Sequence, residues 1–598
     1  MTTTMRRRML SALGGALAAG AGLGLGELTA ALAGGTSPVV GVATHLVDLA
    51  PGPAKDWAVK NLGTADKPVL IGVVLLGVAV FALLAGAIGA SRPRIAVVMT
   101  VLLGLLAILA AATGRTLAPN HFIRILPGII TLLTATTGII LVLRTLNLHP
   151  FDGGGHRKAA AAEGSKTIAN SNHHPKPATT PAPTIATAPA PATAPAPATA
   201  PAPATAPAPA TATAPATAIA PAPATATAPA SATASAPGPA TAPAGFDRRG
   251  FLVTAMALGA AGVGGLVVSR VLPDGVSEAT RMGIKVPTPA SPAGAVPAGV
   301  SADVAGVIRF VTPNKQFYRV DTLLTVPKIN PRSWELRVHG MVDHELRLNF
   351  ADLLGRRLIE RDITLTCVSN EVGGPYVGNA RWIGVPIAEI LREAGVHADA
   401  DAVRSTSVDG LTIGTPLKAL TDGRDAIFAV AMNGEPLPFE HGFPVRMVVP
   451  GLYGYVSATK WVVDIEVTRF EDFSAYWTDR GWAVEAPIKT SSRIDVPKGF
   501  AQLKAGPAVA AGVAWAQHRG ITKVEVQVDD GPWQPAQLAA EDTIDTWRQW
   551  TFRWNATPGN HKLTVRATDA DGQVQTADRA APRPNGSSGL HNTVVMVE

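Results

Sequence analysis

Cysteine is nearly missing from this chain: Cys367 is the only one among 598 residues. A single thiol excludes an intrachain disulfide framework. It also excludes every zinc or iron–sulfur site that needs several cysteines. Any redox metal must therefore arrive with most of its ligands already attached, for example in an organic cofactor.

Aromatic residues are also scarce, at 5% of the chain, and the formal net charge of +7 comes from basic residues scattered along the sequence. Nucleic-acid-binding domains typically show a basic stripe with interleaved aromatic residues. No such stripe occurs here, so we expect no nucleic-acid partner. A chain of this length should instead contain more than one domain.

Long apolar runs are abundant, and five are long enough to cross about 30 Å of hydrocarbon as helices. They cover about residues 5–35, 68–90, 95–113, 122–146 and 251–272. Basic residues at 6–8 and 92–94 favour the cytoplasmic side, which places everything after the fifth run outside the cytoplasm. We expect no ionisable residue of an ion path in these runs, so the helices should serve as an anchor or docking surface.

Between the fourth and fifth runs the chain consists largely of Pro, Ala and Thr. Such a composition cannot bury a core and favours an extended, semi-rigid spacer. A glycosylated extracellular stalk has a similar composition and would contradict the orientation above. The sequence that follows the spacer favours the cytoplasmic interpretation.

That sequence is FDRRGFL at residues 246–252, and it opens the fifth apolar run. It resembles the twin-arginine export signal, although Asp247 and Val253 replace the usual Ser or Thr and the usual Lys. The alternative is an ordinary basic flank of a membrane helix. The resemblance implies export of a domain that has folded with its cofactor. No small-residue cleavage site follows, so we expect the helix to remain as an anchor.

The remaining sequence is globular and mixed. Strand-like alternation at 334–340, 446–450 and 460–467, with a short helix at 388–394 ended by Gly395, predicts an α+β domain. Beyond about Val484 the helix signals vanish. A strand at 524–528 leads into a hairpin turn at 529–531, and further strands at 550–554, 562–567 and 593–597 predict a small β-sandwich.

Cys367 follows a predicted buried strand at 363–366 and precedes a loop, SNEVGG. Its residue type alone leaves two interpretations open. It is either a small buried hydrophobe, as free cysteine often is, or a soft thiolate that binds a metal or acts as a nucleophile.

Three features together resemble a known family. These are the single cysteine after a strand, the segment MNGEPLP at 432–438, and the string HGFPVRMVVPG at 441–451, followed by Lys460-Trp461 and a β-sandwich. This order is similar to the sulfite oxidase family of molybdopterin enzymes, over about residue 303 to the C-terminus. The resemblance implies a molybdenum–molybdopterin (Mo-MPT) cofactor.

The resemblance also implies roles for individual residues. Cys367 would supply a thiolate to molybdenum and Arg319 would orient an anionic substrate, so these two are the candidate catalytic residues. The segment around Arg319 would line the cofactor, and others would hold the pterin and its phosphate. The candidate cofactor-binding residues are Phe317, Tyr318, Arg319, Val320, Asp321, Cys367, Asp409, His441, Arg446, Ser457, Thr459 and Lys460.

The sequence departs from the family pattern near the metal. Sulfite oxidases have Cys-Ala-Gly-Asn-Arg-Arg, whereas Val368-Ser369-Asn370-Glu371 follows Cys367 here. The active-site tyrosine of the family is missing near residues 410–413. Loss of positive charge and of a hydroxyl should weaken binding of a small dianion. We expect Arg381 to compensate.

The predicted architecture is an all-α transmembrane region, then an α+β sulfite-oxidase-type molybdopterin domain, then an immunoglobulin-like β-sandwich. The boundaries are 1–148 for four membrane helices, 149–245 for the linker, 246–272 for the fifth helix, 273–302 for a tether, 303–483 for the molybdopterin domain and 484–598 for the sandwich. The family implies that the sandwich forms a homodimer.

We therefore predict a membrane-anchored, extracytoplasmic molybdenum oxidoreductase that transfers an oxygen atom to or from a small oxyanion or sulfoxide-type substrate. No haem-binding domain is visible, so electrons should pass to or from a separate carrier, a cytochrome or membrane quinone. The alternatives are a sulfoxide or nitrate-type reductase of the same fold and a non-catalytic cell-envelope binding protein.

Overall fold

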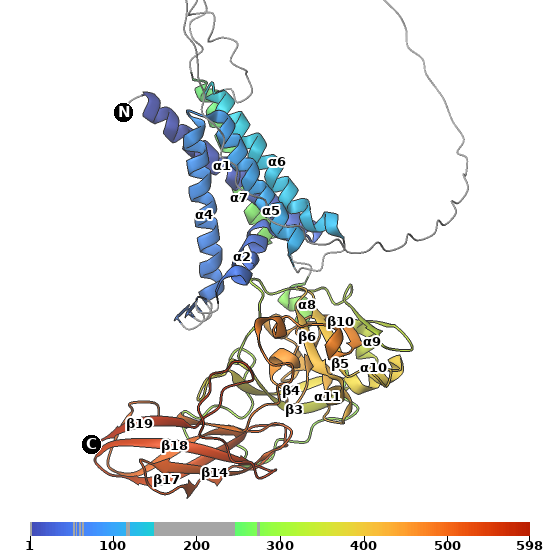
Figure 1. Cartoon of the computed structure of the whole chain (residues 1–598), viewed down its shortest axis with the longest axis vertical. Coiled ribbons are helices and arrows are strands. Elements are labelled where there is room, and N and C mark those ends of the chain that lie inside the picture. The colour runs from blue at the N-terminus through green and yellow to red at the C-terminus, as the bar shows by residue number, and fades with distance from the viewer. Residues whose placement is uncertain are drawn as a thin grey trace, which may run out of the picture. The chain divides into compact units, whose positions relative to one another are not determined.

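The computed structural model describes residues 3–51, 54, 57–58, 61–62, 65–114, 120–148, 246–271 and 276–598. The predicted linker at 149–245 lies outside these residues, so its extended conformation stays a prediction. The described residues form an N-terminal helical part, a central α+β region and a C-terminal region rich in strands (Figure 1).

The described N-terminal part is entirely helical. Its helices are α1 Thr3–Ala33, α2 Pro38–Leu49, α4 Asp66–Gly89, α5 Pro93–Thr113, α6 His121–Thr145 and α7 Arg248–Val271. All of these except the short α2 are long and apolar enough to cross a membrane. Their bounds match the five predicted apolar runs to within a few residues, which confirms the runs as helices.

Small residues let these helices approach closely. A Cβ on Gly24 of α1 would lie 2.3 Å from the carbonyl oxygen of Gly262 in α7, and one on Gly15 would lie 2.4 Å from that of Ala82 in α4. Backbones at this separation gain van der Waals contact that larger side chains would prevent. The glycine- and alanine-rich composition of α1 therefore serves helix packing.

One ionisable residue, Glu27, lies inside α1, and its contacts bear on the expectation that these runs carry no ion path. Its carboxylate accepts hydrogen bonds from the Ser37 hydroxyl at 2.7 Å and from the Val39 N–H at 3.3 Å. These groups stand at the N-terminus of α2, where unpaired N–H groups favour a negative charge. Glu27 thus caps a neighbouring helix.

The central region contains two five-stranded sheets. One has the order β2-β1-β10-β5-β6, with only the β1–β10 pair parallel, and the other has the order β3-β4-β7-β8 with β9 paired to β7. The strands are β1 Glu335–Gly340, β2 Leu346–Asn349, β3 Ile359–Thr366, β4 Val377–Pro386, β5 Ala402–Ser407, β6 Thr412–Pro416, β7 Ile427–Met432, β8 Glu435–Pro436, β9 Arg446–Val448 and β10 Val462–Thr468.

Short helices connect these strands. They are α8 Glu278–Met282, α9 Phe350–Leu354, α10 Ile387–Ala394 and α11 Leu417–Thr421, with 3₁₀ turns η2 Phe439–His441, η3 Gly454–Val456, η4 Phe470–Asp472 and η5 Thr478–Arg480. Helix α10 buries Ile387, Ile390 and Leu391 on one face and ends at Gly395, whose φ of +71° is left-handed. The predicted short helix, its glycine cap and the α+β class are confirmed.

The C-terminal region contains two more sheets that pack face to face. Residues of both contribute to one core, including Ala514 and Trp550 from one sheet and Val526 and Val565 from the other. The predicted hairpin at 529–531 joins β14 to β15. The strands are β11 Ser491–Val496, β12 Gln502–Leu503, β13 Gly506–Trp515, β14 Ile521–Val528, β15 Gln534–Pro535, β16 Gln537–Leu538, β17 Arg548–Ala556, β18 Gly559–Asp569 and β19 His591–Val597.

The C-terminal strands and the central region share part of their core. Trp515 and Trp547 belong to the largest buried cluster of the central region, and the Trp547 indole N–H donates to the Phe310 carbonyl at 2.9 Å. The segment predicted as a tether also packs here, since the Ala290 N–H donates to the Leu358 carbonyl at 2.9 Å. The central sheets, which frame the site described below, are therefore packed against both the C-terminal strands and the segment that precedes them.

One brace reaches the loop that follows Cys367. Gly373 has a φ of +79°, and a Cβ on it would lie 2.2 Å from the ring of His591. The His591 Nδ1 accepts a hydrogen bond from the Ile494 N–H at 3.0 Å. Burial, followed by the charge of Arg493, lowers the pKa of His591 to about 4.

We expect this histidine to make the fold sensitive to mild acid. Between pH 6.5 and 4 the unfolded chain takes up a proton at this position and the folded chain does not, so the free energy of unfolding falls as the pH falls. From pH 6.5 to 5 the loss should be about 1–2 kcal/mol. Thermal unfolding of the detergent-solubilised chain should show His591→Gln flattening the pH profile. The exposed His344→Gln control should leave it unchanged.

Candidate functional site

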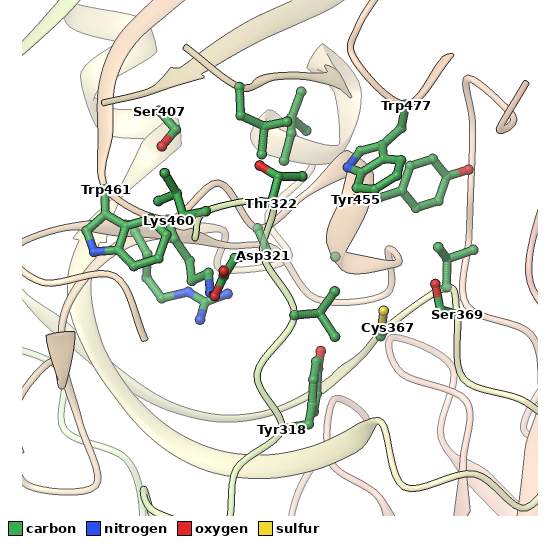
Figure 2. A pocket seen from close by; sticks show the side chains of 18 of the residues that line it. Tyr318, Asp321, Thr322, Cys367, Ser369, Ser407, Tyr455, Lys460, Trp461 and Trp477 are labelled. Carbon is green, nitrogen blue, oxygen red and sulfur yellow. The ribbon is translucent and has the colours of Figure 1, made fainter. Parts of the chain in front are cut away.

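A pocket with a volume of about 120 Å³ lies where the ends of strands from both central sheets meet. Cys367 directly follows β3, Arg446 begins β9, Ser407 ends β5 and Lys460 stands two residues before β10. Residues as far apart in the sequence as Cys367 and Lys460 thus converge here, because the sheets bring their strand ends together. Figure 2 shows the side chains around this space.

Most of the predicted site residues line this pocket. Those that do are Phe317, Tyr318, Val320, Asp321, Cys367, Asp409, His441, Arg446 and Lys460. Arg319, Ser457 and Thr459 are not among the lining residues. The roles predicted for all twelve residues stay predictions.

The three residues outside the lining have partners of their own. The Arg319 Nε–H donates to Asp321 at 2.8 Å. The buried Ser457 hydroxyl donates to the Tyr453 carbonyl at 3.0 Å, and the hydroxyls of Thr459 and Ser405 are 2.6 Å apart. These side chains therefore already have protein partners in the structure.

Cys367 is 8% exposed and lines the pocket. Burial raises the pKa of its thiol, while hydrogen bonds from the Ser369 backbone and hydroxyl and the charge of Lys460 oppose the rise. Ser369 and Lys460 therefore stabilise a thiolate where burial disfavours one. Such a thiol gives up its proton most readily when a cation replaces it.

The loop after the cysteine is fixed by its own side chains. The Asn370 side-chain oxygen accepts from the Tyr376 N–H at 2.8 Å, and the Cys367 N–H donates to the Tyr376 carbonyl at 3.0 Å. Asn370, which stands where the family pattern also has Asn, closes the loop, and Glu371 stands where that pattern has its first Arg. Glu371 is exposed and is not among the lining residues.

The expectation that Arg381 compensates for the missing basic pair is wrong. Its guanidinium donates to both oxygens of the buried Asp362, at 3.0 and 2.6 Å, and to the Gly294 carbonyl at 2.8 Å. Arg381 is absent from the described lining of the pocket. The arginine holds the N-terminal segment against β3 and β4.

Arg446 is a buried cation without a carboxylate partner in the described part of the chain. Its hydrogen bonds go to the carbonyls of Met447 and His441, both at 3.3 Å, and its guanidinium lies 5.1 Å from the centre of the Trp382 ring. Burial lowers its pKa to about 10. A guanidinium held this way is suited to bind an anion.

Lys460 lies beside Arg446, and Gly442 makes room for both. With a φ of +112°, Gly442 passes so close that a Cβ would be 3.0 Å from the Cβ of Arg446 and 3.2 Å from that of Lys460. Burial lowers the pKa of Lys460 to about 8, although Asp321 opposes the shift. Its Nζ donates to Asp321 at 2.9 Å.

The carboxylate of Asp321 pairs with cations from three segments of the chain. It accepts from Lys460, from Arg319 at 2.8 Å and from Lys67 at the start of α4 at 2.5 Å. Burial alone would raise the pKa of its carboxyl, but these three cations together hold it well below its usual range. The carboxylate therefore stays ionised and neutralises only part of the surrounding positive charge.

A stack of rings forms the floor between the cysteine and the cations. Phe317 stacks on Tyr318 with ring centres 5.2 Å apart and meets Trp382 and His441 edge-on. The His441 Nε2–H donates to the Asn314 carbonyl at 2.8 Å, and burial lowers the pKa of this ring to about 4. Burial also raises the pKa of Tyr318. Both side chains are thus neutral near pH 7.

Sequence reasoning missed two kinds of lining residue. The buried Ser407 hydroxyl oxygen has no hydrogen-bond partner among the described residues. Tyr455, Trp477 and Trp482 form an aromatic cluster in which Trp482 contacts both other rings. The only signal for these rings was a local concentration of aromatic residues, YWTDRGW at 476–482, in a chain that has few.

Comparisons with known proteins bear on this part of the chain. The family model of the oxidoreductase molybdopterin binding domain matches residues 323–477. Mitochondrial sulfite oxidase of Mus musculus is 29% identical over 323 residues, which are 46% of this chain and 58% of that protein. The uncharacterized oxidoreductase YuiH of Bacillus subtilis is 36% identical over 149 residues, which are 25% of this chain and 72% of that protein.

Two further similarities complete the comparison. Mitochondrial sulfite oxidase of Drosophila melanogaster is 31% identical over 322 residues, which are 45% of this chain and 55% of that protein. The chain thus spans less than two thirds of the mouse and fly proteins. The match to the crystal structure of sulfane dehydrogenase SoxCD from Paracoccus pantotrophus covers 49% of this chain and 84% of the SoxCD chain, with 22% sequence identity and a TM-score of 0.43.

We expect the environment of Cys367 to be measurable by alkylation. Because burial raises the thiol pKa, the metal-free folded chain should react with iodoacetamide at pH 7.5 about 100-fold more slowly than the unfolded chain. Ser369→Ala should slow the folded chain further, since it removes a hydrogen bond to the thiolate. The exposed Ser301→Ala control should not. Equal rates in folded and unfolded chains would contradict this description.

Proposed function

Because the chain belongs to the sulfite oxidase family of molybdopterin oxidoreductases, we propose that it transfers an oxygen atom at a molybdenum–molybdopterin cofactor held in the pocket around Cys367. The chain is an oxidoreductase with this cofactor by its family. The assignment of the pocket, the membrane location and the electron partner are our proposals.

One observation carries the assignment of the pocket. Three groups line the same pocket: the sole cysteine, Cys367; the buried guanidinium of Arg446, which has no described carboxylate partner; and the buried hydroxyl of Ser407, which has no described hydrogen-bond partner. A polar atom buried without a partner costs free energy unless a ligand satisfies it. A soft metal that carries an anionic organic ligand would bind the thiolate, pair with the guanidinium and hydrogen-bond the hydroxyl. The residues present therefore fit the cofactor.

The chain's own residues divide the work of holding it. The Cys367 thiolate would be the protein ligand to molybdenum, with Ser369 donating to its sulfur. Arg446 and Lys460 would bind the anionic phosphate of the pterin, and Ser407 and Asp409 would hydrogen-bond its ring system. His441, whose only N–H is used on the Asn314 carbonyl, would accept a hydrogen bond through Nδ1 as a neutral imidazole. Ser457, Thr459 and Arg319 would keep the wall and Asp321 in place.

When bound, the molybdenum centre supplies oxygen-atom transfer coupled to a two-electron change. The single protein thiolate leaves other coordination positions for substrate. The neutral Tyr318 contributes an O–H group beside Cys367 that can donate to an oxygen atom. Electrons would pass to or from a separate carrier, either a cytochrome or a membrane quinone.

The membrane location follows from the five apolar helices and the charges at their ends. Arginines at 6–8 and 92–94 would lie in the cytoplasm, and the helices would then carry the residues after α7 to the outer side. Lys67 and Asp48 would lie on that same side. Their ion pairs with Asp321 and Arg480 agree with this topology.

The two packed sheets of residues 491–597 agree with an immunoglobulin-like sandwich. We include in the proposal that this region forms a homodimer, which analytical ultracentrifugation of the solubilised chain would test. The dimer does not enter the chemistry of the pocket.

Cys367→Ser tests the metal assignment directly. Oxygen is a harder and weaker ligand than thiolate for this metal, so activity should fall by at least about 1,000-fold while the fold is retained. Metal analysis, X-ray absorption and thermal unfolding should show one sulfur ligand fewer per molybdenum and an unfolding midpoint close to the wild type. Ser369→Ala is the matched neighbour and should keep the sulfur count. Full turnover in Cys367→Ser would remove the assignment.

Replacing Arg248 and Arg249 by Lys tests export. If the pair acts as a twin-arginine signal, the conservative change should leave the C-terminal region in the cytoplasm, although the positive charge is unchanged. Protease added to spheroplasts should then degrade this region in the wild type and spare it in the variant. Arg270→Lys at the other end of α7 is the control. Equal degradation of all three would assign Arg248 and Arg249 to an ordinary basic flank.

A further inference from the structure

We propose that the pocket accepts an uncharged organic sulfoxide or its thioether, and that Tyr455, Trp477 and Trp482 bind the apolar group of that substrate. This inference rests on the proposed function and narrows its substrate class. It follows from where the aromatic and the charged side chains lie in the pocket.

The three rings form one wall because several contacts fix them. The rings of Tyr455 and Trp482 are 5.6 Å apart, and those of Trp477 and Trp482 are 6.3 Å apart and nearly perpendicular. The backbone N–H of Trp482 donates to the Trp477 carbonyl at 3.1 Å, which closes the turn between the two residues. The Tyr455 hydroxyl donates to the Ala483 carbonyl at 2.8 Å. The wall is therefore preorganised rather than formed by loose side chains.

The wall stands beside the cysteine. Gly454 packs near the Thr366 carbonyl, which a Cβ on the glycine would approach to 3.9 Å, so the Gly454–Tyr455 turn adjoins the strand end that carries Cys367. Figure 2 shows Cys367 and Ser369 on the same side of the pocket as Tyr455 and Trp477. Aliphatic side chains of Leu411 and Ile413 also line the pocket.

The cations lie elsewhere. Figure 2 shows Lys460, Asp321 and Trp461 across the pocket from Cys367. Arg446 adjoins Lys460 through an isolated bridge between the two residues. If the cofactor phosphate binds Arg446 and Lys460, these two cations are no longer available to pair with a substrate at the metal.

The charge of the lining agrees with this division. Among the described lining residues, the carboxylates of Asp321 and Asp409 balance the cations of Arg446 and Lys460 in number. The other two cations near Asp321, Arg319 and Lys67, pair with that carboxylate and are not among the lining residues, so the described lining itself carries no surplus of positive charge for a dianion. Arg480, which lies within the sequence segment that carries Trp477 and Trp482, stands 3.6 Å from the ring centre of Tyr476, pairs with Asp48 at 3.5 Å and is not among the lining residues.

An apolar wall favours the binding of a substrate that carries an apolar substituent. Burying such a group against aromatic rings is favourable, whereas bringing a dianion to the same place would cost its hydration without a paired cation. A sulfoxide or thioether presents one oxygen or sulfur to the metal end and one carbon group to the wall.

The overall reaction is balanced as R–S(O)–R′ plus two electrons and two protons giving R–S–R′ and water, or the reverse. The S–O bond breaks in the reductive direction, and the released oxygen leaves as water. The two electrons come from, or go to, a one-electron carrier. In the test below that carrier is reduced methyl viologen.

The experiment uses the full solubilised chain with its cofactor, after its molybdenum and pterin content has been measured. Four probes are compared: methyl phenyl sulfoxide, dimethyl sulfoxide, nitrate, and sulfite with ferricyanide as the electron acceptor. We expect turnover of methyl phenyl sulfoxide with kcat/KM at least about 10-fold above dimethyl sulfoxide, because only the former fills the wall. Sulfite and nitrate should be turned over far more slowly.

Trp477→Ala and Trp482→Ala should each lower kcat/KM for methyl phenyl sulfoxide by about 10- to 30-fold, mainly through KM. For dimethyl sulfoxide the change should stay within about threefold. Trp477→Phe should recover most of the loss, which a merely structural role in folding would not predict. Trp533→Ala, in the β14–β15 hairpin, is the control.

A binding measurement supplies a second readout. Calorimetric titration with methyl phenyl sulfone, which carries the same ring, should show a Kd about tenfold weaker in Trp477→Ala than in the wild type. A wild type that holds molybdenum but prefers sulfite or nitrate would overturn this inference and leave the proposed function standing. So would equal losses for all probes in the tryptophan variants. A chain without molybdenum or pterin and without turnover of any probe would overturn both.

Discussion

A buried guanidinium without a described carboxylate partner is the constraint on which the site depends. Arg446 contacts carbonyls and the face of Trp382, and Lys460 and Asp321 stand next to it. An ionised group in such a place is costly unless something negative joins it. The surrounding structure keeps it there: Gly442 passes close behind both cations, and Asp321 neutralises only part of the charge. The described residues of the pocket thus supply no anion of their own that pairs directly with Arg446, which favours binding of one from outside.

The same reasoning explains why the sole cysteine is buried rather than reactive. Burial raises the thiol pKa, and Ser369 and Lys460 only partly offset this. A metal ion reverses the balance, because it replaces the proton and needs a thiolate. Under the proposed function, the anion beside Arg446 and the cation at Cys367 would belong to one ligand of mixed charge. Its binding would offset both unfavourable burials and so would stabilise the folded state.

Much of the fold could be predicted from short-range patterns. The buried strand before Cys367, the glycine cap of α10 and the hairpin after β14 have local signals in the sequence, and each is confirmed. Long-range pairing is different. Nothing near Arg381 in the sequence shows that Asp362 would hold it, since that contact depends on the register of β3 against β4. Ser407 and the rings of Trp477 and Trp482 join the pocket only after strands from two sheets meet, so residue type and spacing did not reveal them.

The division of the pocket into a charged end and an aromatic end follows from topology rather than from any one motif. Arg446 and Lys460 belong to neighbouring segments joined by a β-bridge, and Tyr455 and Trp477 come from turns that follow β9 and β10. The Tyr476 N–H donates to the Thr412 carbonyl at 3.3 Å, which fixes the aromatic segment against β6. These anchors do not involve Cys367, Arg446 or Lys460, so we expect that the aromatic wall can change without disturbing the cations. Under the proposed function, such a scaffold would separate substrate choice from cofactor binding. Trp477 and Trp482, rather than Cys367, would then determine the substrate class.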